Sequence, residues 1–249
     1  MMKTLAIYSS KGGVGKTATA VNLAYTAAIS GQRTLLCDMD SQGAASYYFR
    51  IKAKKKFNSE KLLDGEIARN IRGTDFPGLD LLPAHFSFRN LDLALNRLAE
   101  KKRRQALAGL FAPLSDDYDV LVLDCPPNLT LLSENIIEAA DTLVCPVIPT
   151  TLSLIALEQL LKLFSKLDAD KDKILAFFSM VERRKSMHLA MMEKYSKYPL
   201  FLKTSIPFLA EIEKMGIMRQ PVGATARLSP AARQYDKLWQ EVWERSVRR

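Results

Sequence analysis

Short apolar runs alternate with helical patterns along most of the chain. The strand-like runs are residues 5–9, 34–37, 79–82, 119–124, 142–147 and 174–180. A helical pattern covers residues 16–30 and is expected to end at Gly31. A longer helix is predicted along a row of leucines: Leu91, Leu95, Leu98 and, at its limit, Leu110. Continuous apolar strands separated by helices are typical of a parallel sheet buried on both faces. The pattern therefore predicts an α/β fold with a mostly parallel, doubly wound sheet, in one domain over residues 1–249.

Three polar segments follow predicted strands, at residues 11–17, 38–42 and 124–128. Open parallel sheets bind their ligands at the carboxyl ends of the strands. Since these segments all lie at such ends, we expect them to form one ligand site.

The first segment reads Lys11-Gly-Gly-Val-Gly-Lys-Thr17, between a strand and a helix. Its glycines let successive N–H groups turn toward phosphate oxygens, and the helix N-terminus adds partial positive charge. Lys16 is expected to reach the β- and γ-phosphates, and the Thr17 hydroxyl to bind Mg²⁺. The pattern predicts a P-loop NTPase whose nucleotide-binding residues are Lys11, Gly12, Gly13, Val14, Gly15, Lys16, Thr17 and Ala18.

Carboxylates mark the other two segments. Asp38 and Asp40 end one strand, and Asp124 ends another, directly before Pro126 and Pro127. An aspartate here can bind Mg²⁺ through a water, as in a Walker B strand, or can cap the next helix. Beside a phosphate loop we favour the metal role, with Thr17, Asp38 and Asp124 as ligands.

Two departures from the usual phosphate loop point to a particular family. Ser10 replaces its first glycine, and Lys11 supplies a second lysine. This deviant Walker A motif resembles the ParA/MinD superfamily of dimeric ATPases, and the resemblance to ParA proteins extends over essentially the whole chain. It implies an ATP hydrolase that uses ATP and Mg²⁺, in which Lys11 crosses a dimer interface to the partner's nucleotide.

The resemblance also implies roles for single residues. Asp40 corresponds to the carboxylate that orients the attacking water, so that the predicted catalytic residues are Lys11, Lys16 and Asp40. Asp38 supports its loop and the Mg²⁺ shell. Pro207, in an Ile-Pro segment, corresponds to the proline that contacts adenine.

A net charge of +9 favours a polyanionic partner, either nucleic acid or an anionic membrane surface. Basic residues cluster at 50–61, at 101–104, at 183–185 and at the C-terminal arginines, although each cluster alone is more often a solvated face. With the resemblance, this charge predicts non-specific DNA binding by an ATP-bound homodimer, in a cytoplasmic, nucleoid-associated protein. A ParB-like or cargo-adaptor protein would stimulate hydrolysis. The candidate DNA contacts are Arg219, Arg227, Arg233, Arg245 and Arg248.

Two other functions stay open on sequence grounds. A MinD-like protein would bind membranes through its last helix, and here aromatic and aliphatic residues recur at helical spacing: Tyr235, Leu238, Trp239, Val242 and Trp243. The same spacing is also typical of a final helix packed on the body, which we favour. A nucleotide-dependent switch would bind neither DNA nor membrane.

Overall fold

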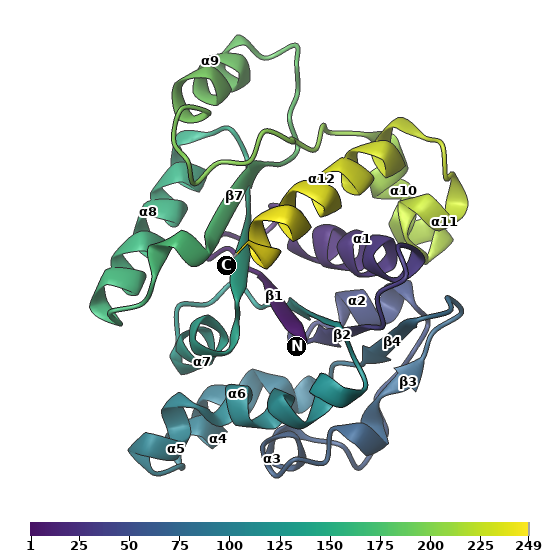
Figure 1. The fold of residues 1–249 in the computed structure, drawn as a ribbon, viewed down its shortest axis with the longest axis vertical. Coiled ribbons are helices and arrows are strands. Elements are labelled where there is room, and N and C mark those ends of the chain that lie inside the picture. The colour runs from purple at the N-terminus through teal and green to yellow at the C-terminus, as the bar shows by residue number, and fades with distance from the viewer. Residues whose placement is uncertain (249) are drawn as a thin grey trace.

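The computed structural model describes residues 1–248 and centres on one seven-stranded sheet (Figure 1). The strands are β1 (Lys3–Ile7), β2 (Thr34–Asp38), β3 (Arg72–Gly73), β4 (Leu79–Leu82), β5 (Val120–Asp124), β6 (Thr142–Val147) and β7 (Ile174–Phe178). Their order is β3-β4-β2-β5-β1-β6-β7, and every neighbouring pair except β3–β4 is parallel. The predicted α/β fold with a mostly parallel, doubly wound sheet is confirmed.

Helices cover both faces of this sheet (Figure 1). One face packs against α1 (Lys16–Ile29), α2 (Ala44–Tyr48), α10 (Ala210–Met218), α11 (Val222–Thr225) and α12 (Pro230–Val247). The other lies under α3 (Ser59–Leu63), α4 (Leu91–Asn96), α6 (Ala106–Phe111), α7 (Leu131–Ala139), α8 (Thr151–Lys166) and α9 (Ser186–Tyr195), with α5 (Glu100–Arg104) at the surface.

Alternate residues of each central strand enter the two cores. Leu121 and Leu123 of β5 face one core, whereas Val120 and Val122 face the other. Because both faces are buried, the strand needs apolar residues at every position, and this explains its continuous apolar sequence.

The C-terminal helix packs on the body of the protein. Its apolar residues Leu238, Trp239 and Val242 are almost fully buried in the core that α1 also lines, and Trp243 stacks on Trp239 with ring centroids 5.2 Å apart. The apolar face that an interfacial helix would offer to lipid is therefore already covered. No helix within residues 1–248 is long and apolar enough to cross a membrane.

The prediction of one long helix after Leu91 was wrong. The chain forms α4, α5 and α6 instead, with extended backbone at Ala99 (φ −57°, ψ 143°) and a further break at Gln105. Both α4 and α6 bury apolar residues, but α5 buries none and carries four consecutive cations. The middle turn has no apolar residue to bury, so packing does not stabilise one continuous helix through it. The breaks on either side allow α4 and α6 to pack separately.

Candidate nucleotide-binding site

Strands β1, β2 and β5 lie side by side in the middle of the sheet and carry the predicted site at their carboxyl ends. In the strand register, Asp124 pairs with Ile7 on one side and with Asp38 on the other. The structure thus places the two predicted metal ligands, Asp38 and Asp124, on adjacent strands, and both are buried.

The phosphate loop joins β1 to α1. Gly13 and Gly15 have φ values of 71° and 91°, a region that side chains other than glycine rarely adopt. A Cβ atom on Gly15 would lie 3.2 Å from the Ser179 hydroxyl, whereas one on Gly12 or Gly13 would meet nothing within 4 Å. The first turn of α1 contains no acidic residue, so its N-terminal partial charge remains free for an anion.

The two lysines of the loop have different surroundings. Lys16 is 8% exposed, and its Nζ donates a hydrogen bond to the carbonyl oxygen of Lys11 at 3.1 Å. Burial lowers the pKa of Lys16, and the negative charge of Asp124 opposes this shift. The Nζ of Lys11 instead donates to the Ser153 hydroxyl at 3.0 Å, in the first turn of α8. One lysine therefore lies inside its own loop, and the other is held by a different element.

Three of the four oxygens of the two buried carboxylates have no hydrogen-bond partner within the described chain. Oδ2 of Asp38 accepts bonds from the Ser46 N–H and hydroxyl, both at 2.7 Å, but its Oδ1 has none. Neither oxygen of Asp124 has a partner. Burial raises the pKa of Asp38 to about 6, and the charge of Asp40 adds to the rise. Burial and the charge of Asp38 raise the pKa of Asp124 well above its usual range. The nearby side-chain hydroxyl of Thr17 lowers this pKa and so opposes the rise.

These residues fit a magnesium ion. Mg²⁺ prefers oxygen ligands and is usually held by one or two carboxylates together with nucleotide phosphates. Asp38, Asp124 and the Thr17 hydroxyl offer such a set. Residues 1–248 contain no group of three His, Cys, Asp or Glu side chains that could hold a metal by themselves. Two carboxylates and a hydroxyl suit a Mg²⁺ ion whose remaining ligands are nucleotide phosphates and water.

Asp40 and Pro207 lie on loops near strand ends. Oδ1 of Asp40 accepts the N–H of Gln42 at 3.0 Å, and its carbonyl accepts that of Gly43 at 2.9 Å, which together fix the turn between β2 and α2. Pro207 pairs with Val181 just beyond β7 and lines a cavity of about 260 Å³. Asp40 is therefore held close to Asp38, and Pro207 lies beside Val181, which follows the Ser179 and Met180 side chains that approach Gly15 of the phosphate loop.

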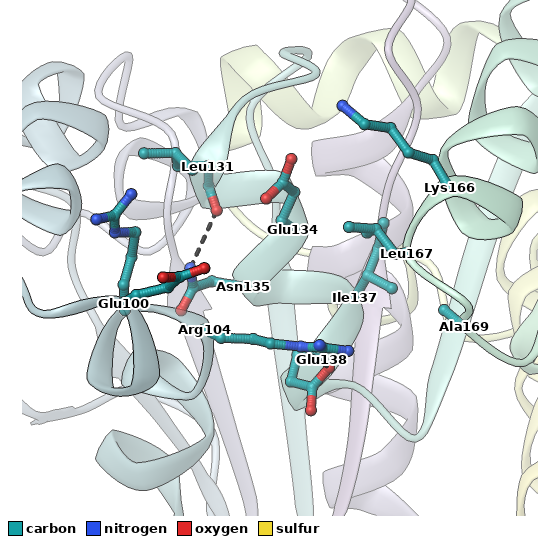
Figure 2. Close-up of a pocket in the computed structure, with 11 residues that line it drawn as sticks. Glu100, Arg104, Leu131, Glu134, Asn135, Ile137, Glu138, Lys166, Leu167 and Ala169 are labelled. Atoms are coloured by element: carbon teal, nitrogen blue, oxygen red, sulfur yellow. Dashed lines mark hydrogen bonds and ion pairs between the residues drawn. The ribbon is translucent and has the colours of Figure 1, made fainter.

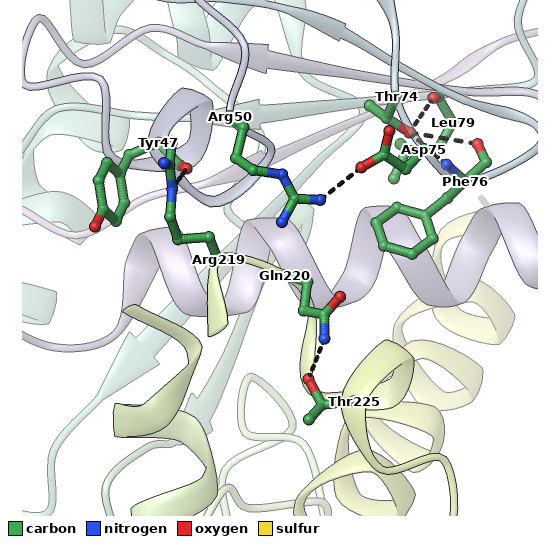
Figure 3. Close-up of polar contacts among 9 residues, drawn as sticks. All are labelled: Tyr47, Arg50, Thr74, Asp75, Phe76, Leu79, Arg219, Gln220 and Thr225. Atoms are coloured by element: carbon green, nitrogen blue, oxygen red, sulfur yellow. Dashed lines mark hydrogen bonds and ion pairs between the residues drawn. The ribbon is translucent and has the colours of Figure 1, made fainter. Parts of the chain in front are cut away.

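Most of the candidate DNA-contacting arginines make intramolecular contacts. Arg219 ends α10, donates to the carbonyl of Tyr47 at 3.1 Å and lies over its ring at 4.3 Å (Figure 3). Arg227 pairs with Asp236 at 3.6 Å, and Arg245 donates to the carbonyl of Pro199 at 2.7 Å. The remaining two are on α12 or at its end, where Arg248 lies 4.0 Å from Glu244 and Arg233 is exposed.

Two contacts at the site were not predicted from the sequence. Ser46 fixes Asp38 from the following helix, and Ser153 binds Lys11 across 142 positions of the chain. No sequence motif marks Ser46 before the fold is known, whereas Ser153 ends a segment, residues 146–153, that resembles a ParA segment near the nucleotide.

A phosphate loop, a buried lysine and two strand-end carboxylates define a P-loop nucleotide-binding protein. The AAA domain family matches residues 2–177 of the chain. The Soj protein of Bacillus subtilis, a sporulation initiation inhibitor, is 32% identical over 219 residues, which cover 83% of this chain and 85% of Soj. The chain belongs to the ParA family of partition ATPases.

Further comparisons find a related sequence and solved structures with the same fold. An uncharacterised protein of Pseudomonas putida is 36% identical over 149 residues, which cover 59% of this chain and 56% of that protein. Among solved structures, a cobyrinic acid a,c-diamide synthase of Mycobacterium smegmatis with a bound ATP analogue and magnesium has a TM-score of 0.82 and 25% identity, and the match covers 98% and 95% of the two chains. A putative plasmid partition protein of Borrelia burgdorferi bound to AMPPNP has a TM-score of 0.81 at 22% identity over 100% and 99%, and shows the same fold.

The unpartnered carboxylates lead to a prediction about stability. Asp124→Asn removes a buried charge beside Asp38 while keeping the shape of the side chain. Without nucleotide and Mg²⁺, in slightly alkaline buffer, the free energy of unfolding of the variant should be no lower than that of the wild type. We expect it to be higher by about 0.5–2 kcal/mol. The measurement is urea denaturation, with Asp64→Asn at an exposed position as the control. A loss of more than about 1 kcal/mol would show that the carboxylate stabilises the fold.

Proposed function

We propose that this chain is a ParA-type positioning ATPase, with residues 1–249 acting as one ATPase domain. ATP and Mg²⁺ close a sandwich homodimer, the dimer binds DNA without sequence preference, and a ParB-like or cargo-adaptor protein stimulates slow hydrolysis. ADP-bound monomers then leave the DNA. The cargo carried by the partner is a plasmid, a chromosome or a protein assembly.

The observation that carries this proposal is the different position of the two lysines. Lys16 is buried in its own loop, where it can bind the phosphates of the nucleotide in the same chain. Lys11 is only half-buried and is held by a neutral hydroxyl on α8, which it can leave at little cost. A cation supplied by a second chain stabilises transition-state charge and makes hydrolysis depend on dimerisation.

The other site residues have roles that follow from their positions. The backbone of residues 12–15 would surround the phosphates, and Thr17, Asp38 and Asp124 would hold Mg²⁺, which would neutralise phosphate charge when bound. Asp40, on the turn fixed by Gln42 and Gly43, orients the attacking water. Pro207 contacts the adenine.

Similar proteins and the net charge support the cellular role. Relatives include a chromosome-partitioning ATPase of Treponema pallidum and the chromosome partitioning protein ParA of Caulobacter vibrioides. The charge of +9 favours binding to the phosphates of DNA. The MinD-like alternative is less well supported, because the helix it requires as an anchor is packed into the core.

Binding to random-sequence duplex DNA and to phosphatidylglycerol vesicles tests this function directly. Each is measured with ATP or ADP, at low and at high salt. We expect ATP-dependent DNA binding that weakens steeply with salt, because it rests on phosphate contacts, and no binding to vesicles. Vesicle binding without DNA binding would establish the MinD-like function, and binding to neither would leave a nucleotide-dependent switch.

Replacing each lysine of the loop should remove a different property of the protein, hydrolysis for Lys11 and ATP binding for Lys16. Lys11→Ala should retain ATP affinity within a few-fold but lose hydrolysis by about 10³-fold, because it removes the cation supplied in trans. Lys16→Ala is the matched comparison and should lose ATP binding itself. Nucleotide affinity and phosphate release are measured for both variants. Normal turnover by Lys11→Ala would rule out the trans role, and tight ATP binding by Lys16→Ala would overturn the phosphate-loop assignment.

A further inference from the structure

We propose that a basic strap, residues 50–56 together with Arg69, is the surface through which this protein binds the phosphate backbone of duplex DNA. The proposal rests on the DNA binding put forward above and gives it a location. It replaces the C-terminal arginines as the main contact surface.

The strap is rich in cations that have no carboxylate partner. Arg50 pairs with Asp75 at 2.6 Å (Figure 3). The lysines that follow, Lys52, Lys54, Lys55 and Lys56, are exposed and form no ion pair with any residue of the described chain. Of the acidic residues that follow along the sequence, Glu60 pairs with Arg97 and Glu66 with Lys61, while the exposed Asp64 forms no ion pair with the described residues and offsets part of the charge. The strap therefore keeps most of its positive charge.

The other basic clusters are compensated to a greater extent. Arg104 in α5 lies 3.6 Å from Glu138, beside a cavity of about 270 Å³ that Glu100 and Glu134 also line (Figure 2). Lys185 pairs with Glu182, and Arg248 with Glu244. At each of these clusters an acidic side chain would repel a bound polyanion. The strap is the cluster with the most positive charge that no ion pair compensates.

The strap is held in place although its backbone is irregular. Ile51 and Ala53 pack inward against the two cores, and Phe57, at 1% exposure, meets Phe88 edge-to-face at 5.8 Å. The lysines between these anchors therefore point outward. The Nζ of Lys54 donates to the carbonyl of Arg69 at 2.8 Å, which brings the exposed Arg69 beside the strap. Because the anchors fix the backbone, DNA binding requires little ordering of the chain.

The strap is also joined to the nucleotide site. It begins where α2 ends, with the N–H of Ile51 bonded to the carbonyl of Ser46 at 3.1 Å. The same Ser46 binds Asp38 through its N–H and hydroxyl. One short helix thus fixes the strap relative to the site, so that a dimer joined around two nucleotides presents two straps in a defined arrangement. Two linked surfaces bind a polymer far more tightly than either one alone.

The chemistry of the strap favours DNA over a membrane surface. Binding in the headgroup region normally adds apolar side chains to the basic ones. The strap itself exposes no large apolar side chain, since Ile51 is half-buried and the adjoining Phe57 is buried, and the exposed aromatic residues Tyr47 and Phe86 lie outside it. Exposed lysines with no apolar residue exposed among them suit phosphates that stay in water.

The test compares two triple variants with equal net charge. Lys52→Gln, Lys55→Gln and Lys56→Gln together neutralise the strap, and Lys162→Gln, Lys171→Gln and Lys197→Gln neutralise exposed lysines near the opposite edge of the sheet. Binding to random-sequence duplex DNA and to phosphatidylglycerol vesicles is measured with ATP across a salt series. ATP affinity and thermal unfolding of each variant show that its fold is intact. A third variant with arginine at the three strap positions retains the charge.

The strap variant should bind DNA at least tenfold more weakly than the wild type, and the slope of log affinity against log salt should fall by about 3 for each strap engaged. The control and the arginine variant should stay within about twofold of the wild type. Equal DNA binding by the strap and control variants would overturn this proposal and leave the proposed function intact. A wild type that binds no DNA would overturn the proposed function as well, and loss of vesicle binding alone would identify the strap as a membrane contact.

Discussion

Two carboxylates buried next to each other on neighbouring strands are the constraint on which this site depends. Asp38 and Asp124 face the same edge of the sheet, and three of their four oxygens have no hydrogen-bond partner. Such a pair is unfavourable without a cation, because burial weakens the solvation of both charges. The sheet holds them in place through its register, and Ser46 fixes one of them. In the proposed function, this pair is completed by the Mg²⁺ that binds with the nucleotide.

The segments around the buried Asp38–Asp124 pair are arranged with respect to it. Glycines leave space around the phosphate loop, and the buried Lys16 supplies a positive charge near the carboxylates. The turn at Asp40 and the helix α2 follow directly from Asp38, so that the turn and the basic strap are both connected to one of the two carboxylates. Lys11 is held separately, by the Ser153 hydroxyl on α8, and in the proposed function it leaves this contact for the nucleotide of a second copy of the chain.

Much of the fold and of the site could be predicted because the signals are local. The buried strands are continuous apolar runs, and the phosphate loop is a short motif between a strand and a helix. The breaks around α5 could not be predicted, since the leucine spacing continues across them. The contact of Lys11 with Ser153 and that of Arg219 with Tyr47 join distant parts of the chain, and only the fold brings these residues together.

The claim that ATP joins two incomplete sites is tested most directly by the mass of the protein in solution. Asp40→Ala should bind ATP without hydrolysing it, and sedimentation should then give about 56 kDa, twice the 28.0 kDa of one chain. With ADP the same variant should sediment as a monomer. A monomer in saturating ATP, at concentrations where nucleotide is bound, would contradict the account, because Lys11 would then have no second site to complete.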